Sequence, residues 1–403
     1  MTQSTTIATP DAEGDSPDWA TLSYLDRARL ITPLIEGEAE SIEADKRVTD
    51  KVVDALRDAQ LFWILVPKSL GGAGLGIVEA MEVNEQIAYA DASVGWAFMA
   101  NAFGTGILAG YLPESGSEFL YGGADKAITA GMSAPVGRAV KVDGGLRATG
   151  KWQFGSGSDY ATWIGVGLQV TDADGTPLKT SDGQPDARFA VVPRDSVEFL
   201  GNWDVAGLVG TGSQDYAVSD VFIPEELAMS TFSTTPVRTD GVYYMGLLGI
   251  SVAGHAAVAF GLMRRALHEV AKITDGKQRV GYPSPVGDYA VFQFEFAKYE
   301  AEYQSARAYA YDVYAQAEEF AAREGYLSPE LTARVRQAAT WAHHVTHRVV
   351  SFAHLWSGTQ SFRNPSFMGR ATRDSSVLTQ HLLIDNITMI DAAPALLDSW
   401  KAG

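Results

Sequence analysis

Residues 149–163, TGKWQFGSGSDYATW, begin as a β-strand and then collapse into Gly-Ser-Gly-Ser. Strand alternation predicts that Trp152 and Phe154 share one face. Glycines at the turn remove side chains, so a flat ligand can approach the backbone, and the hydroxyls of Ser156 and Ser158 become available as hydrogen-bonding groups. The alternative is a glycine bulge at a strand end with solvated serines.

A second stretch, VAGLVGTGSQDYAVSDVFIP at residues 205–224, has a similar design. Three glycines bracket Thr211 and Ser213 just before an alternating strand. Such a loop suits a ring edge or a phosphate, and it is equally a hairpin loop. It is neither a P-loop nor a dinucleotide fingerprint, because the lysine and glycine spacings are missing.

The spacing of apolar residues changes twice along the chain, before and after these stretches. After a leader at residues 1–17, apolar residues recur at three- and four-residue spacing over 18–126, which predicts helices. Short alternating runs separated by Asp-Gly pairs and prolines predict a β domain over 127–238. Helical spacing returns over 239–403, in long stretches at 241–272, 286–323, 328–357 and 372–386.

Composition limits the class of protein. The chain has 403 residues, of which 46% are hydrophobic and 20% charged, so it can bury a large core in two or three domains. A formal net charge of −18 and the lack of a basic stripe argue against nucleic-acid binding and favour a small-molecule partner. Without cysteine, disulfides and thiolate metal sites are excluded.

Two segments bear on location. The leader has no basic or apolar region of a signal peptide, so we expect a disordered polar leader and a cytoplasmic protein. The apolar run at 241–263 is long enough to span a bilayer. Its five glycines, His255 and the lack of a second such run favour a buried bundle helix and no membrane contact.

All seven histidines follow residue 250. His343, His347 and His354 could share a face of one predicted helix and hold a metal. That face offers no thiolate and no obvious carboxylate, so we expect bundle histidines and no metal site. The chain also lacks the G-x-S-x-G elbow of many hydrolases.

A third candidate is RATRDSSVLTQHLLID at residues 370–385. Arg373, Asp374 and His381 are predicted on one helix, after the glycine turn SGTQSFRNPSFMGR at 357–370. This arrangement would place an ionisable imidazole near a loop able to touch a ligand. A packed helix histidine is the alternative.

Taken in order, these motifs resemble the acyl-CoA dehydrogenase superfamily. The ordered set is VPKSLGG, the aromatic strand with GSG, GLVGTGS before VFIP, KQRVGYP, and RD with a histidine eight residues after the arginine. Within the superfamily they look most like two-component flavin-dependent monooxygenases, which hydroxylate aromatic and heteroaromatic compounds with reduced flavin from a separate reductase. The resemblance implies an α+β fold with an N-terminal helical domain, a central β-barrel-like domain and a C-terminal four-helix bundle that builds a homotetramer.

The resemblance also implies a flavin site. Ser156 would hydrogen-bond near flavin N5, and Arg279 and Gly358 would reach the flavin diphosphate of a neighbouring subunit. The cofactor-binding residues implied are Trp152, Phe154, Ser156, Ser158, Thr211, Ser213, Arg279 and Gly358. We expect FAD, used as FADH2, with FMN as the alternative.

Oxygenase and dehydrogenase chemistry differ in the base they need. A dehydrogenase of this superfamily requires a carboxylate, yet no Glu stands near His381, and residues 241–268 hold neither Asp nor Glu. Hydroxylase relatives carry a histidine matching His381. In them the flavin reacts with O2 to give a C4a-hydroperoxide and transfers one oxygen atom. Ser156 and His381 are therefore the expected catalytic residues, with His381 taking or giving a proton.

The substrate pocket is expected to include Asn101, Phe103 and Tyr160. The further histidines of many phenol hydroxylases are absent there, which favours an indole or a sulfur heterocycle over a phenol needing deprotonation. Two rival functions remain: an acyl-CoA dehydrogenase or oxidase with an unusual base, and a catalytically silent flavin-binding protein of the same fold.

Overall fold

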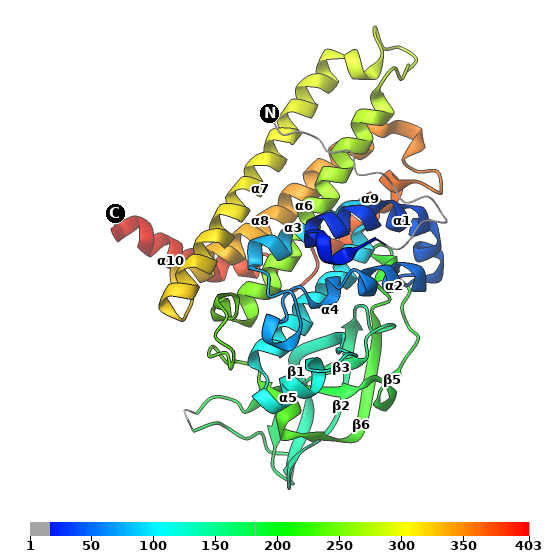
Figure 1. The fold of residues 1–403 in the computed structure, drawn as a ribbon. Coiled ribbons are helices and arrows are strands. Elements are labelled where there is room, and N and C mark those ends of the chain that lie inside the picture. The colour runs from blue at the N-terminus through cyan, green and yellow to red at the C-terminus, as the bar shows by residue number, and fades with distance from the viewer. Residues whose placement is uncertain (1–16, 182, 403) are drawn as a thin grey trace.

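Helices form both ends of the chain and strands its middle in the computed structural model, which describes residues 17–181 and 183–402 (Figure 1). The N-terminal helices are α1 (Tyr24–Asp45), α2 (Asp50–Asp58), α3 (Ile77–Ala90), α4 (Ala92–Tyr111) and α5 (Glu114–Tyr121). The C-terminal helices are α6 (Gly246–Thr274), α7 (Ala290–Glu324), α8 (Pro329–Ser357), α9 (Phe367–Leu378) and α10 (Ile387–Ala402). The predicted fold class is confirmed, whereas the predicted leader lies almost wholly outside the described residues.

The middle of the chain forms one seven-stranded sheet. Its strands are β1 (Thr129–Val142), β2 (Gly145–Gly155), β3 (Trp163–Thr171), β4 (Ala187–Pro193), β5 (Glu198–Phe199), β6 (Gln214–Pro224) and β7 (Ala228–Ser230). They run in the order β5-β6-β2-β1-β3-β4-β7, with β1 and β3 parallel and the other pairs antiparallel. The strand that carries the opening motif, β2, therefore lies inside the sheet with β6 beside it.

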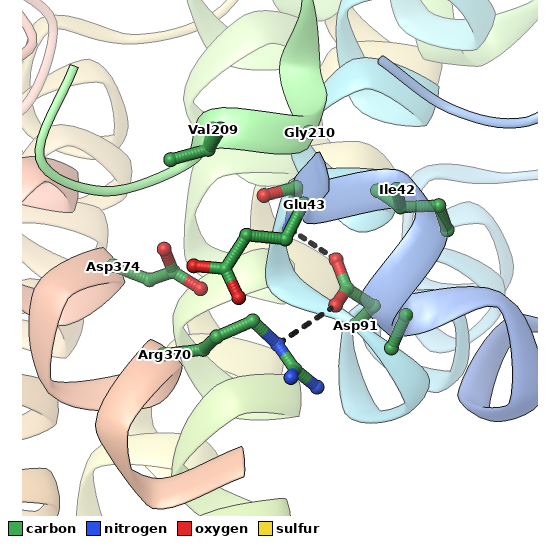
Figure 2. A pocket seen from close by; sticks show the side chains of 9 residues that line it. Ile42, Glu43, Asp91, Val209, Gly210, Arg370 and Asp374 are labelled. Atoms are coloured by element: carbon green, nitrogen blue, oxygen red, sulfur yellow. Dashed lines mark hydrogen bonds and ion pairs between the residues drawn. The ribbon is translucent and has the colours of Figure 1, made fainter. Parts of the chain in front are cut away.

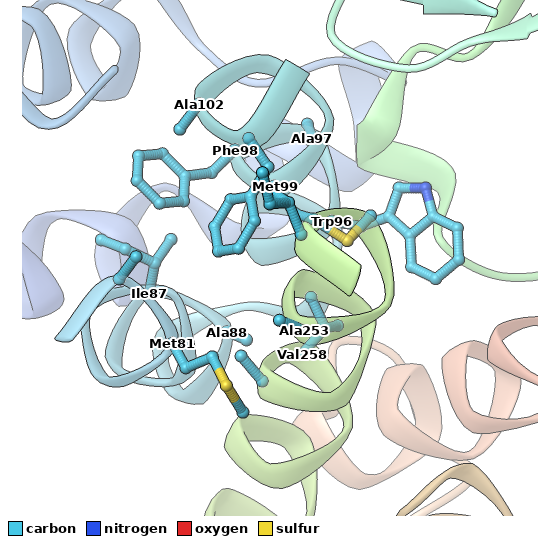
Figure 3. Close-up of a cluster of buried hydrophobic side chains, with 14 of the residues drawn as sticks. Met81, Ile87, Ala88, Trp96, Ala97, Phe98, Met99, Ala102, Ala253 and Val258 are labelled. Atoms are coloured by element: carbon cyan, nitrogen blue, oxygen red, sulfur yellow. The ribbon is translucent and has the colours of Figure 1, made fainter. Parts of the chain in front are cut away.

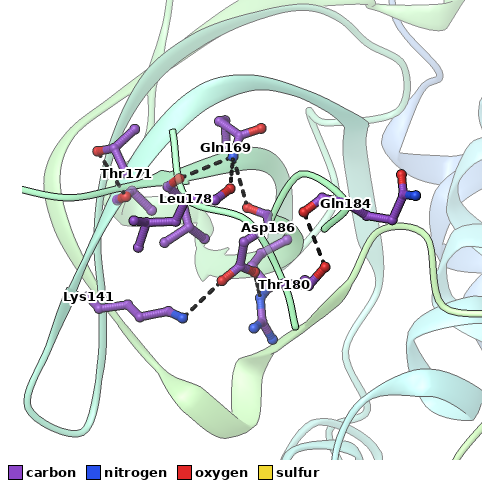
Figure 4. A network of polar contacts seen from close by, with 10 residues as sticks. Lys141, Gln169, Thr171, Leu178, Thr180, Gln184 and Asp186 are labelled. Carbon is purple, nitrogen blue, oxygen red and sulfur yellow. Dashed lines mark hydrogen bonds and ion pairs between the residues drawn. The ribbon is translucent and has the colours of Figure 1, made fainter. Parts of the chain in front are cut away.

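The long connection between β3 and β4 is tied back to the sheet (Figure 4). The Gln169 side-chain amide donates to the carbonyls of Val170, Leu178 and Asp186 at 3.1, 3.3 and 3.2 Å. The buried Asp186 carboxylate also pairs with Lys141 at 2.9 Å. These contacts fix the connection to strands β1 and β3 of the sheet.

Polar caps fix where the important helices begin. The Asp91 carboxylate caps α4 by accepting from the backbone N–H groups of Ser93 and Val94 at 2.9 and 3.2 Å. Ser328 caps α8 in the same way, accepting from the Leu331 N–H at 3.2 Å. Because α4 starts at Asp91, its first turns lie against the loop before β6.

Helix α6 packs against α3, α4 and α8 in the core, and Figure 3 shows side chains of α3, α4 and α6 meeting there. Its glycines permit this approach: a Cβ at Gly254 would lie 2.5 Å from Met99 Cγ, and one at Gly261 would lie 2.5 Å from the Glu85 carbonyl oxygen. Two described helices are long and apolar enough to cross a membrane, Ala92–Tyr111 and Gly241–Thr274, and 89% and 78% of their most apolar windows are buried. The run at 241–263 thus divides into a 3-10 helix, Gly241–Met245, and the mostly buried first part of bundle helix α6. The expectation that the chain has no second such run is wrong, because α4 is also long and apolar enough.

Candidate active site

The two glycine-serine turns form one feature. The Gly157 N–H donates to the Thr211 carbonyl at 3.0 Å, and the hydroxyls of Ser156 and Ser213 lie 2.7 Å apart. These bonds join the end of β2 to the loop before β6. All three hydroxyl residues, Ser156, Thr211 and Ser213, are buried. Two stretches that are about 55 residues apart in sequence therefore build a single polar site.

The hydrogens of these hydroxyls run in one direction. Thr211 Oγ1 donates to the Leu208 carbonyl at 2.8 Å and lies 2.7 Å from Ser213 Oγ. A hydroxyl has one hydrogen, so with the Thr211 hydrogen on the Leu208 carbonyl, Thr211 accepts from Ser213 and Ser213 in turn accepts from Ser156. The Trp96 indole N–H donates to Ser156 Oγ at 3.3 Å. Ser156 is left with one lone pair and no free hydrogen.

The turn itself demands glycine. Gly157 has φ of 69°, and a Cβ there would lie 2.2 Å from Asn101 Oδ1. The Asn101 amide donates to the Thr129 carbonyl at 2.8 Å and to the Gly157 carbonyl at 3.4 Å. Asn101 thus ties α4 to β1 and to the serine turn.

The prediction that Trp152 and Phe154 share a face is wrong. The pairing of β2 with β6 shifts register between Trp152 and Gly155, and Phe154 has a left-handed φ of 61°. Trp152 consequently points into the β domain, fully buried, stacks on Tyr216 and donates its indole N–H to the Gly167 carbonyl at 2.9 Å. It presents no surface to a ligand. Phe154 points outward and is 58% exposed.

Trp96 connects the serine turn to a cluster of imidazoles. Its ring centroid lies 4.8 Å from that of His255 on α6 and 5.6 Å from that of His381. His255 and His381 are 4.3 Å apart, and His343 on α8 is 6.3 Å from His255. Three histidines from distant parts of the sequence therefore form one cluster, which Trp96 connects to Ser156.

The prediction that His381 stands on a helix is wrong, because α9 ends at Leu378. His381 lies in the following turn, where its Nδ1 accepts from the Leu383 N–H at 3.3 Å, a side-chain bond that competes with helical backbone bonding. Because Nδ1 accepts, the neutral ring carries its hydrogen on Nε2. Burial lowers the His381 pKa to about 4, so the ring is neutral at physiological pH and presents an N–H donor.

The other two imidazoles are also neutral. Burial lowers the pKa of His343 to about 4 and, together with His381 and His343, brings that of His255 well below its usual range. No Asp, Glu, Lys or Arg contributes to the pKa shift of any of the three. The cluster is therefore an electrically neutral surface.

Asp374 anchors the loop that carries the hydroxyls (Figure 2). Its buried carboxylate accepts from the Leu208 N–H at 2.6 Å. Burial, with the Asp91 carboxylate nearby, raises the Asp374 pKa to about 7. The cavity between them holds about 10 Å³, room for no more than a water molecule, so it is not a ring-binding site. A wider hollow of about 340 Å³ beside Trp19, Tyr24 and Trp63 contains none of the predicted site residues.

The remaining predicted pocket residues are spread along α4 and the serine turn. Phe103 is buried against Gly254, the neighbour of His255. Tyr160 packs on Phe62, with ring centroids 5.7 Å apart. Buried polar atoms without a protein partner in the described chain include Asn101 Oδ1, Ser158 Oγ and the Tyr160 hydroxyl.

Arg279 and Gly358 lie together at the far end of the bundle. The Arg279 guanidinium donates to the Trp356 carbonyl at 2.6 Å, and a Cβ at Gly358 would lie 2.8 Å from its Nη2. Arg279 does not open a helix, since α7 begins at Ala290. The 19 residues between His255 and Thr274 place this end roughly 28 Å from the imidazole cluster of the same chain.

His343 is buried, His347 exposed and His354 half-buried, so these three of the four histidines on α8 do not converge. Across residues 17–181 and 183–402, no group of three His, Cys, Asp or Glu side chains could hold a metal ion.

Two protein-family models match the chain. The acyl-CoA dehydrogenase N-terminal domain matches residues 28–119, and the acyl-CoA dehydrogenase C-terminal domain matches residues 253–386. Together they cover more than half of it. The chain belongs to the acyl-CoA dehydrogenase superfamily.

Curated relatives in this superfamily align over nearly the full length. The indole-3-acetate monooxygenase of Pseudomonas putida is 29% identical over 91% of this chain and 89% of its own. The oxygenase component of p-hydroxyphenylacetate 3-hydroxylase from Acinetobacter baumannii is 24% identical over 92% and 87%. The structure of XiaF from Streptomyces sp. in complex with FADH2 and glycerol has a TM-score of 0.86 and 20% identity over 93% of this chain and 95% of XiaF, which confirms the fold.

Proposed function

We propose that this chain is the oxygenase component of a two-component flavin-dependent monooxygenase that hydroxylates an aromatic or indole-like small molecule. The overall reaction consumes one O2 and two electrons from reduced flavin, and it yields hydroxylated product, oxidised flavin and water. A separate flavin reductase supplies the reduced cofactor, which we take to be FADH2, with FMN as the alternative. The observation that carries the proposal is the directed chain of hydroxyls ending at Ser156.

Ser156 suits a reduced flavin better than an oxidised one. Its hydrogen is committed to Ser213, so its remaining lone pair can only accept. The reduced isoalloxazine carries a hydrogen on N5, whereas the oxidised ring offers a lone pair there. A single hydrogen bond contributes about 0.5 to 1.5 kcal/mol, so Ser156 biases binding towards the reduced ring without determining it alone.

Other residues of the site fit a flat ring. Phe154 and Leu382 are 58% and 62% exposed and lie close in sequence to the buried Ser156 and the half-buried His381, so each offers apolar surface that a ring could cover. Ser158 Oγ is buried without a described protein partner and suits a polar group of the ligand. Trp152 is fully buried in the β domain and is withdrawn as a cofactor contact.

The bound flavin supplies the oxygen chemistry, and the protein supplies a dry site and placed hydrogen bonds. His381 can donate only through its Nε2–H, because its Nδ1 accepts from the Leu383 N–H. Such a donor stabilises negative charge that develops on oxygen. Trp96 contacts both Ser156 and the imidazoles, so its largely apolar ring joins the two parts of the site.

The dehydrogenase alternative lacks its base. No carboxylate shifts the pKa of His255, His343 or His381, and α6 carries no Asp or Glu before Glu269. The neutral imidazole cluster also suits a neutral aromatic compound.

Assembly and location are proposed with the function. We place the protein in the cytoplasm as a homotetramer, in which Arg279 and Gly358 would reach the flavin diphosphate of a neighbouring subunit. Support for association comes from α10, where Ile387, Ile390, Leu397 and Trp400 are 50%, 66%, 58% and 83% exposed at helical spacing.

Incubation with FADH2, O2 and indole, followed by mass spectrometry of the product and measurement of released hydrogen peroxide, tests the proposal. We expect oxygenated indole and less than one peroxide per flavin oxidised. Bleaching of bound oxidised FAD by an acyl-CoA thioester would support the dehydrogenase instead, and flavin binding without either reaction would support the silent protein.

A further inference from the structure

Two imidazole nitrogens in the described chain are sealed from solvent and have no hydrogen-bond partner: His255 Nδ1 and His343 Nε2. Their rings are neighbours, with centroids 6.3 Å apart. A buried ring nitrogen without a partner is costly, so two of them in adjacent rings call for an explanation.

The tautomer of His343 is fixed by the backbone of α8. Its Nδ1 lies 2.8 Å from the Ala339 carbonyl oxygen, which can only accept, so Nδ1 carries the hydrogen. His343 Nε2 is therefore a bare lone pair. A single hydrogen on His255 Nδ1 could satisfy both sealed nitrogens after a small rotation of the two adjacent rings. With its hydrogen on Nδ1, His255 has a bare Nε2.

His381 has the opposite arrangement, with its hydrogen on Nε2, and its ring centroid lies 4.3 Å from that of His255. We propose that His255 is the proton acceptor of the active site, that His381 is its hydrogen-bond donor, and that His343 is a positioning residue that keeps His255 Nε2 unprotonated. This assignment rests on the monooxygenase function proposed above and names a second catalytic imidazole for it.

The proton balance of hydroxylation needs such a pair. When oxygen adds to a ring carbon, the hydrogen on that carbon leaves as a proton, and its bonding electron pair restores the aromatic ring. His255 Nε2 takes this proton and becomes an imidazolium. The proton then passes to the O2-derived oxygen atom that is not transferred, while the His381 N–H stabilises negative charge on that oxygen until it is protonated. The second hydrogen of the departing water comes from the reduced flavin.

The surroundings leave His255 free for this role. It lies 3% exposed among apolar neighbours of α6, and the groups facing it are the Trp96 ring of α4, His343 of α8 and His381. None of these is a carboxylate that could take the proton instead. The pair thus supplies acceptor and donor without any buried charge in the resting protein.

Long-range 1H–15N NMR of the flavin-free protein, labelled in its seven histidines, tests the tautomers directly. We expect the hydrogen on Nδ1 in His255 and His343 and on Nε2 in His381. His343→Leu removes the lone pair that orients His255, and His255 should then lose its Nδ1–H preference while His381 keeps its own. The matched control is His347→Leu, because His347 lies one turn further along α8 and is exposed. It should change neither the His255 nor the His381 signals.

Activity provides the second arm. His255→Gln should reduce the hydroxylation kcat by roughly 10²-fold or more with FADH2 binding unchanged within twofold. An Nε2–H tautomer for His255 in the wild-type protein would overturn the proposal, as would an unchanged kcat in His255→Gln. Failure of the monooxygenase function itself would look different: the tautomers would be as expected, yet the wild-type protein would form no hydroxylated product.

Discussion

Ser213→Ala tests the direction of the hydroxyl chain. In the folded protein Ser213 Oγ lies 2.7 Å from both Ser156 Oγ and Thr211 Oγ1. Removing it frees the Ser156 hydrogen, which can then donate to the N5 lone pair of an oxidised flavin. The preference for reduced over oxidised flavin should fall by the value of one hydrogen bond, about 0.5 to 1.5 kcal/mol, or roughly 2- to 13-fold in the ratio of the two Kd values.

The assay is fluorescence titration with FAD in air and with FADH2 under anaerobic conditions. Ser376→Ala is the matched control, because Ser376 is exposed on α9 and bonds only its own helix, at the Thr372 carbonyl. Its Kd ratio should equal that of the wild type. An unchanged ratio in Ser213→Ala, or a stronger preference for FADH2, would refute the derived hydrogen-bond direction.

Three further outcomes are expected. His381→Ala should shift turnover from hydroxylated product to hydrogen peroxide while the Kd of FADH2 stays within twofold, as measured by product and peroxide yields per O2. Phe154→Gly should be more stable in urea than Phe154→Ala by about 1 kcal/mol, because only glycine tolerates the φ of 61° without strain; equal stability would contradict a strained turn. Asp374 has a folded-state pKa of about 7, above its usual 3.8, so its protonated form stabilises the fold below pH 4 and this contribution is lost as pH rises through 7. Asp374→Asn keeps an acceptor for the Leu208 N–H but does not titrate. Between pH 4 and 7 its free energy of unfolding, measured in urea, should therefore rise relative to that of the wild type by at most about 1.4 kcal/mol per pH unit.

Local chemistry in the sequence was enough to predict the serine turn and its partner loop. Glycines at 155, 157, 210 and 212 mark tight backbone whatever packs around it, and the hydroxyls between them stand out. What the sequence could not provide was the contact between the turns. The direction of the hydrogen bonds depends on distances across the sheet and on Trp96, whose apolar helix gives no sign of a role.

Two predictions, the shared face of Trp152 and Phe154 and the helical position of His381, failed because of local backbone features that the periodicity of apolar residues does not reveal. The register shift after Trp152 adds a residue on one strand, so Phe154 turns outward and Trp152 remains in the core. The helical spacing of 372–386 continues through His381, yet its side-chain bond to the Leu383 N–H ends the helical pattern.

His255 was recognised only as an argument against a membrane span. A histidine in the middle of an apolar run of 23 residues is the signal that could have marked it, because such a position needs no polar group for packing. Its partners His343 and His381 come from α8 and from the turn after α9, so only the fold brings them together.

Turnover under 18O2 tests the central claim most directly. With anaerobically reduced FAD, indole and 18O2, the account predicts one 18O atom in the hydroxylated product and the other in water. Product without 18O, or complete recovery of the label as hydrogen peroxide while the indole is unchanged, would contradict it.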